Sequence, residues 1–457
     1  MVAIQDPSVF IINEQHRKML VNAIKVEGIV HTNNEFLELV TTPLLEARTL
    51  GDVIIGSRSI GDKLQRLGIF KSVEITLDAN PYSKDSVDVI YKVVEAPRLY
   101  GNTGADFGSY EGRMNMSLNV RNAFGNGETI SGSSSYGIDT ATPLLKRDRV
   151  ENNLNSMQGA SAYHATFTKP LNGDPDTMLE ATAYKVDRDH SIFRSYKETL
   201  RGLTVKYKNI LSNTSIYEAA YDAVWRENHS LTSEASLSVR KEAGHSLKSS
   251  VSQSFTLDTR DDIVFPTGGK YIRLSQEFAG LGGNVQFFKN EFHTIGALRL
   301  PRNFGLSASL RGGVLFPYSF DAVPRTRIND RFSLGGPTSL RGFEQGGVGP
   351  KEKNDSLGGD MYYGLGLGFS FPLPVLPVNF FRGHIFGNGG TLVPLKQGTF
   401  FESSKQLLFN PSVSSGIGLV ARFTNFRLEL NYCVPLRITS TDTLKPGLQF
   451  GIGMNFM

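Results

Sequence analysis

The residue best placed to do chemistry is Arg341, which stands between Leu340 and Gly342-Phe343, behind the turn-forming segment Gly335-Gly336-Pro337. A basic side chain with apolar neighbours, on a glycine-hinged segment too long for a hairpin turn, predicts a loop that folds back into a cavity. Its guanidinium would need an acceptor there, because an unpaired buried charge is costly. We therefore interpret Leu340, Arg341, Gly342 and Phe343 as a functional loop. The alternative is an ordinary surface loop between two strands.

No other pattern points to catalysis. The eight histidines are scattered without metal-ligand spacing, and Cys433 is the single cysteine, so neither a metal site nor an intramolecular disulfide is expected. The run Gly364-Leu365-Gly366-Leu367-Gly368 is a poor phosphate loop, since no helix follows it. No nucleophile-elbow spacing and no tight Lys/Arg cluster occur. The sequence thus predicts a protein that is not an enzyme, has no cofactor or metal, and does not bind nucleic acid.

Most of the chain shows the period-two alternation of β-strands. Met114–Val120, Ile417–Phe423, Phe426–Val434 and Leu448–Phe456 alternate bulky apolar residues with small, polar or charged ones. Such alternation is typical of transmembrane strands, with one face toward lipid and the other toward the lumen. It also explains a mean hydropathy of only −0.19. No apolar run reaches the roughly 18 residues that a transmembrane helix needs.

We interpret residues 98–457 as an antiparallel transmembrane β-barrel. At ~20–24 residues for each strand with its turn, the segment would hold roughly 16 strands. A large soluble β protein is the alternative. It would have to cover one face of each strand with a second layer while the other face carries Arg and Glu, so it is less favoured.

Residues 1–97 differ in pattern and are interpreted as a separate α/β domain. An apolar helical stripe with Gly68 at its end alternates with period-two segments. Asn33 is a reasonable N-cap for the first helix. The predicted order is strand, helix, helix, strand, strand, at Met19–Glu27, Asn33–Val40, Leu50–Leu67, Phe70–Leu77 and Val87–Val93.

Several strings resemble a known family. The N-terminal order with the turn Leu67-Gly68-Ile69-Phe70 is similar to a POTRA domain, and Leu340–Phe343 resembles the signature loop of the BamA-type outer-membrane insertase superfamily. Within that superfamily the chain resembles the core barrel subunit of the mitochondrial sorting and assembly machinery (SAM or TOB complex). The strings that carry this second resemblance are Val239–Ser250, Arg331–Ser339 and Arg427–Pro435.

One departure from the superfamily concerns the partner of Arg341. Bacterial relatives tend to place an Asp in a Phe-x-Asp-x-Gly strand motif that faces the loop arginine. The matching string here is Phe386-Gly387-Asn388-Gly389-Gly390, and Asn388 accepts a hydrogen bond but has no charge. We therefore expect the charged acceptor elsewhere, with Asp360 as the first candidate.

The resemblance implies insertion of other β-barrel proteins into the mitochondrial outer membrane. A strand in lipid needs a partner for its backbone groups, so a new strand needs a template edge. The first barrel strand, about Tyr100–Ser109, holds Gly101, Gly104 and Gly108, and the last, Leu448–Phe456, holds Gly451 and Gly453. Because glycine weakens strand pairing, we expect a lateral seam between these two strands that opens toward a client.

The last strand also resembles a client. Gln449, Gly451, Met454 and Phe456 follow the order polar, glycine, apolar, apolar of the β-signal by which client barrels are recognised. The family implies as partners β-barrel precursors, membrane lipid, metaxin-type subunits and the inner-membrane contact-site (MICOS) complex. It also implies that the N-terminal domain lies in the intermembrane space. A protein-translocating or diffusion pore of an outer membrane is the alternative function.

Overall fold

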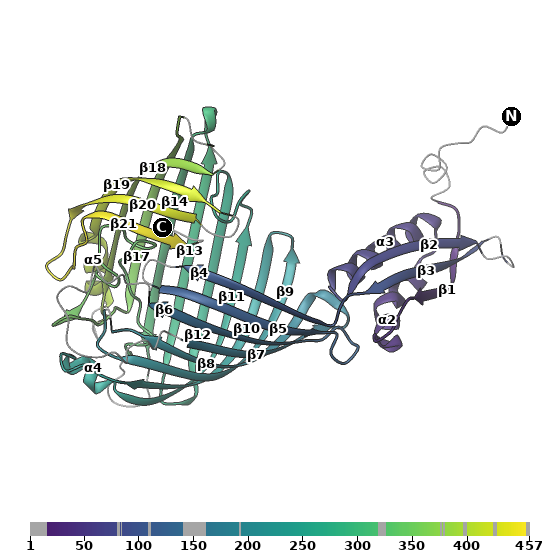
Figure 1. Ribbon diagram of the computed structural model, residues 1–457, viewed down its shortest axis with the longest axis horizontal. Helices are drawn as coiled ribbons and strands as arrows, with labels where there is room; N and C mark the ends of the chain where they lie inside the picture. Colours follow the sequence, from purple (N-terminus) through teal and green to yellow (C-terminus); the bar gives the residue numbers. More distant parts are fainter. Residues whose placement is uncertain are drawn as a thin grey trace.

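The computed structural model describes residues 16–79, 83, 85–107, 111–139, 161–191, 193–318, 326–374, 377, 380–395, 400–423 and 427–453. Its main element is one 16-stranded sheet, curved into a barrel (Figure 1). This confirms the predicted fold class and strand number. The strands are β4 (Leu99–Phe107), β5 (Glu111–Arg121), β6 (Thr129–Asp139), β7 (Ser161–Leu171), β8 (Asp174–Asp189), β9 (Lys197–Ser212), β10 (Ser215–His229), β11 (Gly244–Asp258), β12 (Gly269–Gly283), β13 (Phe287–Arg299), β14 (Gly305–Pro317), β17 (Met361–Pro372), β18 (Phe381–Val393), β19 (Ser412–Arg422), β20 (Arg427–Arg437) and β21 (Gly447–Gly453).

Each strand pairs antiparallel with its neighbour, and β4 and β21 form the two ends of the strand order. Side chains alternate across the wall as the sequence predicts. On β20, Leu430 is 47% exposed on the outer face, whereas Glu429 beside it is fully buried on the lumen face. Within the described residues, no helix is long and apolar enough to cross a membrane.

The N-terminal unit is a three-stranded sheet with helices packed against it. β1 (Leu20–Glu27) pairs parallel with the central strand β3 (Ser86–Glu95), and β2 (Phe70–Ala79) pairs antiparallel with it. The helices are α2 (Asn34–Thr41), the 3-10 turn η1 (Thr42–Glu46) and α3 (Leu50–Arg66). The element order matches the sequence prediction. The assignment to the POTRA family, and the boundary at residue 97, stay predictions.

A capping box fixes the start of α3, because Thr49 accepts from the Asp52 backbone and Asp52 accepts from the Thr49 backbone. Asn33 lies at the N-cap position of α2, as predicted, but its side chain does not cap the helix. Its side chain makes no cap hydrogen bond and instead donates to the Phe124 carbonyl and to Asn126 in the β5–β6 turn. The residue at the helix start thus ties the unit to the barrel.

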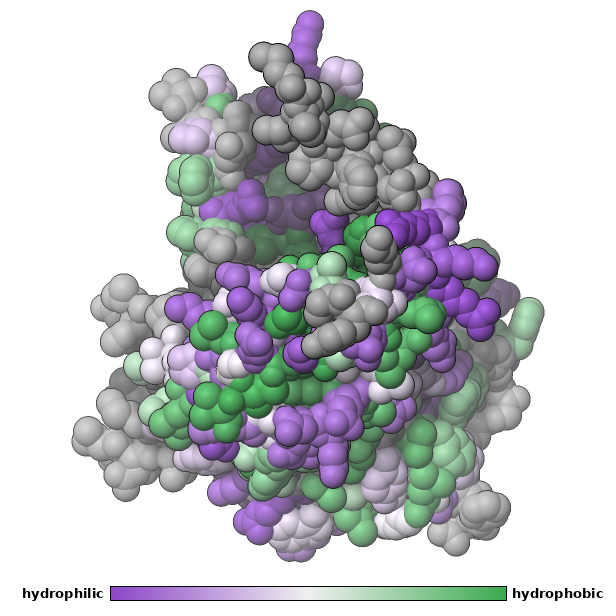
Figure 2. Space-filling model, turned by 90° about the vertical axis from the view of Figure 1, so that its right-hand side faces the viewer, coloured by the Kyte–Doolittle hydropathy of each residue, from purple (hydrophilic) through white to green (hydrophobic). Residues whose placement is uncertain are grey.

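The N-terminal unit lies beside one end of the barrel (Figure 1), here called the near rim. It rests on the β5–β6 and β7–β8 turns, where Asn122 donates to Thr32 at 2.9 Å. At Gly173 the backbone φ is +67°, and an added Cβ would be 2.5 Å from a Val40 methyl group. Hydrophilic and hydrophobic residues are interspersed over the outer surface of this side of the molecule (Figure 2).

The opposite end, the far rim, carries α4 (Leu237–Lys241) and α5 (Phe400–Phe409). From this rim residues 326–360, the inner loop, fold back into the barrel between β14 and β17; they include β15 (Lys351–Glu352) and β16 (Asp355–Ser356). The near-rim turn η3 (Pro301–Asn303) joins β13 to β14. Arg194 anchors the inner loop by donating to the carbonyls of Ile328 and Ser356, at 3.2 and 3.1 Å.

Candidate functional site

The inner loop carries the predicted functional tetrapeptide to the lumen wall. Leu340 and Phe343 are fully buried and Arg341 is 2% exposed. Leu340 and Phe343 pack in an apolar cluster with Phe287, Leu315 and other residues of the strands and loop. Gly342 has φ +86°, and an added Cβ would be 3.1 Å from the Ser414 Cβ. A side chain at Gly342 is therefore disfavoured both by backbone strain and by the wall behind it.

Arg341 pairs with Glu429 of β20. Its Nε and Nη2 donate to Glu429 Oε2 at 3.1 and 2.8 Å. The guanidinium also lies over the Phe386 ring, 4.8 Å from the centroid. Glu429 Oε1 lies 2.9 Å from Arg427 Nη2, so one fully buried carboxylate serves two arginines. Removing this carboxylate would leave both cations buried without their counter-charge, which costs several kcal/mol of stability.

The two acceptors expected from the sequence lie in different places. In the amide orientation that satisfies both ends of the side chain, the Asn388 oxygen accepts from Arg341 Nη1 at 2.9 Å. The carboxylate on the guanidinium belongs to Glu429 rather than to Asp360. Asp360 lies 3.7 Å from Arg331 instead and accepts from the Leu395 backbone at 2.9 Å, because the backbone at Asp360 is hydrogen-bonded to both β14 and β18 where these strands reach the far rim.

The backbone of the inner loop binds the last strand. Gln449 of β21 accepts from the Gly342 N–H at 2.9 Å and donates to the Phe343 carbonyl at 3.2 Å. Lys445, just before β21, donates its N–H to the Gly342 carbonyl at 2.9 Å. Ser414 of β19 donates to the Arg341 carbonyl at 2.5 Å. The loop is therefore hydrogen-bonded to β19, β20 and β21 at once.

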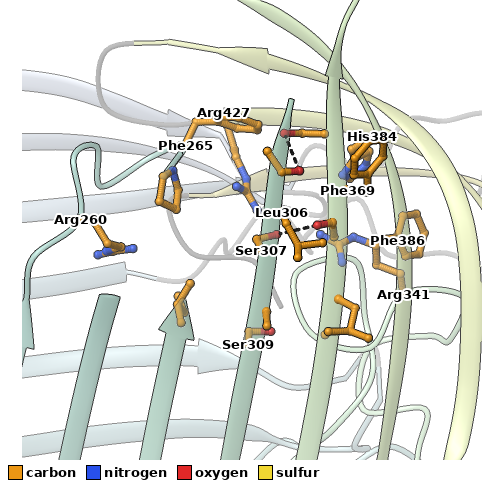
Figure 3. A pocket seen from close by; sticks show the side chains of 18 of the residues that line it. Arg260, Phe265, Leu306, Ser307, Ser309, Arg341, Phe369, His384, Phe386 and Arg427 are labelled. Carbon is orange, nitrogen blue, oxygen red and sulfur yellow. Dashed lines mark hydrogen bonds between the residues drawn. The ribbon is translucent and has the colours of Figure 1, made fainter. Parts of the chain in front are cut away.

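A cavity of about 70 Å³ adjoins the site toward the near rim. Arg341, Phe386 and His384 project into it from one side, and Arg427 and Phe265 from the other (Figure 3). His384 hydrogen-bonds to Asn431 at 2.6 Å, and Asn431 donates to Glu429 at 2.9 Å. The polar network thus extends from the loop along the lumen face of β18 and β20. Within the described residues, no group of His, Cys, Asp and Glu has the arrangement of a metal site.

The predicted seam residues that the structure describes lie at the two ends of the strand order. Gly101 and Gly104 are exposed on β4, and an added Cβ at Gly104 would have nothing within 4 Å. Gln449, Gly451 and Gly453 lie on β21. Gly108, Met454 and Phe456 lie outside the described residues. Within the described residues no backbone ladder joins β4 to β21.

The site contains residues that the sequence prediction did not name, among them Glu429 and Ser414, which both bond to Arg341. Glu429 stands on the lumen face of a strand whose outer face is Leu428, Leu430 and Tyr432. A carboxylate on the lumen side of a strand whose outer side is apolar indicates a buried hydrogen-bond acceptor. Ser414 carries no comparable signal, since its role depends on the loop backbone that reaches it.

Comparisons with known proteins were informative over nearly the whole chain. The Omp85 superfamily domain matches residues 122–456. A SAM50-like protein of Schizosaccharomyces pombe is 34% identical over 96% of this chain and 90% of its own length. The sorting and assembly machinery component 50 homologues of Bos taurus and Homo sapiens are 34% and 33% identical over 97% of this chain and 92% of their own lengths.

The solved structure of BamA from Haemophilus ducreyi lacking POTRA domains 1–3 superposes with a TM-score of 0.76 at 18% identity, covering 95% of this chain and 84% of that one. At that identity the likeness concerns the fold.

Proposed function

The chain belongs to the Omp85 superfamily and, within it, to the family of the sorting and assembly machinery component 50, and from this premise we propose that it inserts and assembles β-barrel proteins in the mitochondrial outer membrane. The working part is the seam, meaning the junction of β4 and β21. A client strand pairs with an exposed edge there, since strands in lipid need every backbone group bonded.

The observation that carries this proposal is the unequal state of the two sheet ends. β4 pairs with β5 on one side, and its other edge has no strand partner among the described residues, whereas β21 is bound from the lumen by the inner loop through Gln449. An edge with free N–H and C=O groups is a template for a new strand. β4 is thus the proposed docking edge, and β21 the strand that a client replaces.

Gln449 supports a specific recognition step. It stands at the polar position of the β-signal-like pattern, and its amide makes both a donated and an accepted hydrogen bond to the loop backbone. A client strand with a polar residue at the same position offers the same pair of bonds. The inner loop would then hold the client strand as it holds β21 here.

The even strand number places the start of β4 and the end of β21 at the same rim, the near rim, beside which the N-terminal unit lies. The proposed orientation, with this rim toward the intermembrane space, is taken from the family. Protease added to intact mitochondria should spare residues 1–97. Cleavage there with the outer membrane intact would contradict the orientation. Metaxin-type subunits and the MICOS complex remain partners proposed from the family.

The decisive experiment locks the seam in the full chain. With Cys433→Ser as background, cysteine pairs are placed at Gly101 or Thr103 on β4 and at Leu448 or Phe450 on β21, which all lie on the outer face of the wall. Oxidation forms a disulfide only where two Cα atoms come within about 7 Å. The oxidised barrel in liposomes should remain folded but stop assembling a porin precursor, and reduction should restore assembly.

The second candidate is a translocation or diffusion pore. An oxidised barrel that assembles porin at the normal rate would remove the seam mechanism and favour a pore. The buried contacts of Leu340, Arg341 and Phe343 with the lumen wall speak against free diffusion, because they keep the loop inside the barrel. Flux of large solutes through liposomes without any assembly would support the pore.

A further inference from the structure

Two cations lie side by side on the outer face of the barrel wall. Lys185 of β8 and Arg201 of β9 are register partners, and both are exposed. In the alternation along the strands they fall on the lipid-facing side, because Tyr163 and Leu203 on the same face are 53% and 48% exposed. The row that contains them runs Met116, Ser134, Tyr163, Lys185, Arg201 and Trp225 from β5 to β10.

The next row toward the near rim is made of small residues. Gly132, Ala165 and Ala183 are successive partners between Leu118 and Leu203. An outer groove of about 650 Å³ follows this row, with Met116 and Leu118 at one end and Lys185 and Arg201 at the other. The groove is therefore apolar along its length and cationic at one end.

The cations are only partly compensated. Lys185 lies 3.5 Å from Asp187, whereas no carboxylate pairs with Arg201 in the part of the chain that the structure describes. The Arg201 guanidinium lies over the Trp225 ring, 4.9 Å from its centroid. Like charges opposite one another destabilise a strand pair, so a bound anion would relieve the repulsion between Lys185 and Arg201.

The position along the strands fits the headgroup level. Lys185 precedes the far-rim end of β8 at Asp189 by four residues, and Arg201 follows the far-rim start of β9 at Lys197 by four. Four residues span roughly 13 Å of strand, and strand tilt shortens that depth further. Trp and Tyr, which flank the pair here, are enriched at that level of a bilayer.

We propose that this groove binds an anionic phospholipid, with the phosphate on Lys185 and Arg201 and an acyl chain along Gly132, Ala165 and Ala183. The occupant is a lipid rather than a soluble anion because cations and apolar groove form one continuous surface on the lipid-facing wall. The site lies on β5 to β9, and β5 pairs directly with β4. A bound lipid there occupies the outer wall next to the proposed docking edge.

Trp225 supplies the measurement, since it is the only tryptophan of the chain and lies under Arg201. The full protein is reconstituted in phosphatidylcholine vesicles that contain a minor fraction of phosphatidylglycerol, and bromine is placed on the acyl chains of one lipid or the other. Brominated phosphatidylglycerol should quench Trp225 more strongly than its share of the lipid predicts. Salt should reduce the preference.

The test variant is Lys185→Gln with Arg201→Gln. Its preference for phosphatidylglycerol should fall about fivefold for each cation removed, while quenching by brominated phosphatidylcholine stays unchanged and reports normal insertion. Arg58→Gln with Lys63→Gln, on α3 of the N-terminal unit, removes the same charge away from the barrel and should keep the preference. Arg201→Lys should keep most of it.

Three outcomes in the absence of added phosphate would overturn the proposal. They are equal quenching by both lipids in the unaltered protein, an unchanged preference in the double variant, and an equal loss in the α3 control. Inorganic phosphate added to the vesicles distinguishes the anion source. If phosphate abolishes the preference for phosphatidylglycerol at constant ionic strength, the two cations bind a soluble anion. This result would also contradict the lipid proposal.

Discussion

The two ends of the barrel sheet differ in how they are held. β21 is fixed from the lumen by the inner loop, through two hydrogen bonds of Gln449 and one of Lys445. Among the described residues, β4 is held by its pairing with β5 and by the short connection to the N-terminal unit, where Arg98 donates to the Ala123 carbonyl at 2.9 Å. The comparison indicates that the strand at an end of the sheet is held or left open according to whether a loop in the lumen is hydrogen-bonded to it. Glycine content is similar at both ends and does not distinguish them.

The largest effect is expected from Glu429→Gln, which leaves Arg341 and Arg427 without their carboxylate. Breaking a buried ion pair by removing one partner costs about 3–5 kcal/mol, so the inner loop should detach and the urea midpoint of the barrel in detergent should fall sharply. Glu180→Gln is the matched control. Glu180 pairs with Lys206 at 3.4 Å on a partly exposed lumen surface, and its loss should cost less than about 1 kcal/mol. Similar losses in both variants would contradict this account.

Next in size is Gln449→Met, which keeps the volume and removes the bonds that hold β21 to the loop. Leaving the Gly342 N–H and the Phe343 carbonyl unpaired should cost roughly 1–3 kcal/mol. Hydrogen exchange in β21 should rise while exchange in β4 stays high, so the two edges become alike. Gln276→Met, whose amide bonds to Gln253 and Asn290 on an exposed face, should leave β21 unchanged. Unaltered exchange in β21 would argue against bracing by the loop.

Three features follow from the sequence because each depends on residues that are close together in the chain. They are the order of the strands, the alternation of their two faces and the burial of Arg341. Period-two alternation sets the outer face, and a cation between Leu340 and Gly342 demands an acceptor. The identity of that acceptor does not follow, because Glu429 is brought to Arg341 only by the path of the inner loop. The same holds for Asn33, whose local sequence predicts a helix cap but whose side chain bonds to a turn of the barrel.

A smaller effect is expected from Gly173→Ala at the near rim. The new methyl group meets Val40 and the backbone has positive φ, so the N-terminal unit should loosen from the β7–β8 turn. The control is Gly68→Ala, which has a similar φ of +71° but nothing within 4 Å; it carries the strain without the clash. Limited proteolysis at residues 96–98 should increase for Gly173→Ala only. Equal proteolysis of both variants would assign the effect to backbone strain.

The smallest effect concerns Glu95, which accepts from the backbone N–H groups of Val30, His31 and Thr32. Burial raises the pKa of Glu95, but these hydrogen bonds outweigh burial, and the net pKa lies below its ordinary value. A lowered folded-state pKa contributes stability above the unfolded pKa that is lost as pH falls through the folded one. Hydrogen exchange at residues 28–33 should therefore rise, relative to its intrinsic rate, as pH falls below about 4. Glu95→Gln should show fast exchange at every pH; a pH response unchanged in that variant would exclude Glu95 as its source.

The amide of Gln449 bears on how the proposed client strand would be recognised. A carboxamide carries an acceptor oxygen and an amino group with two N–H donors, so this one side chain bonds to both an N–H and a C=O group of the loop backbone, as a neighbouring strand would. In the proposed function, a client strand is therefore recognised through a side chain that points into the lumen. An asparagine at this position is one methylene shorter, so we expect it to lose at least one of the two hydrogen bonds to the loop.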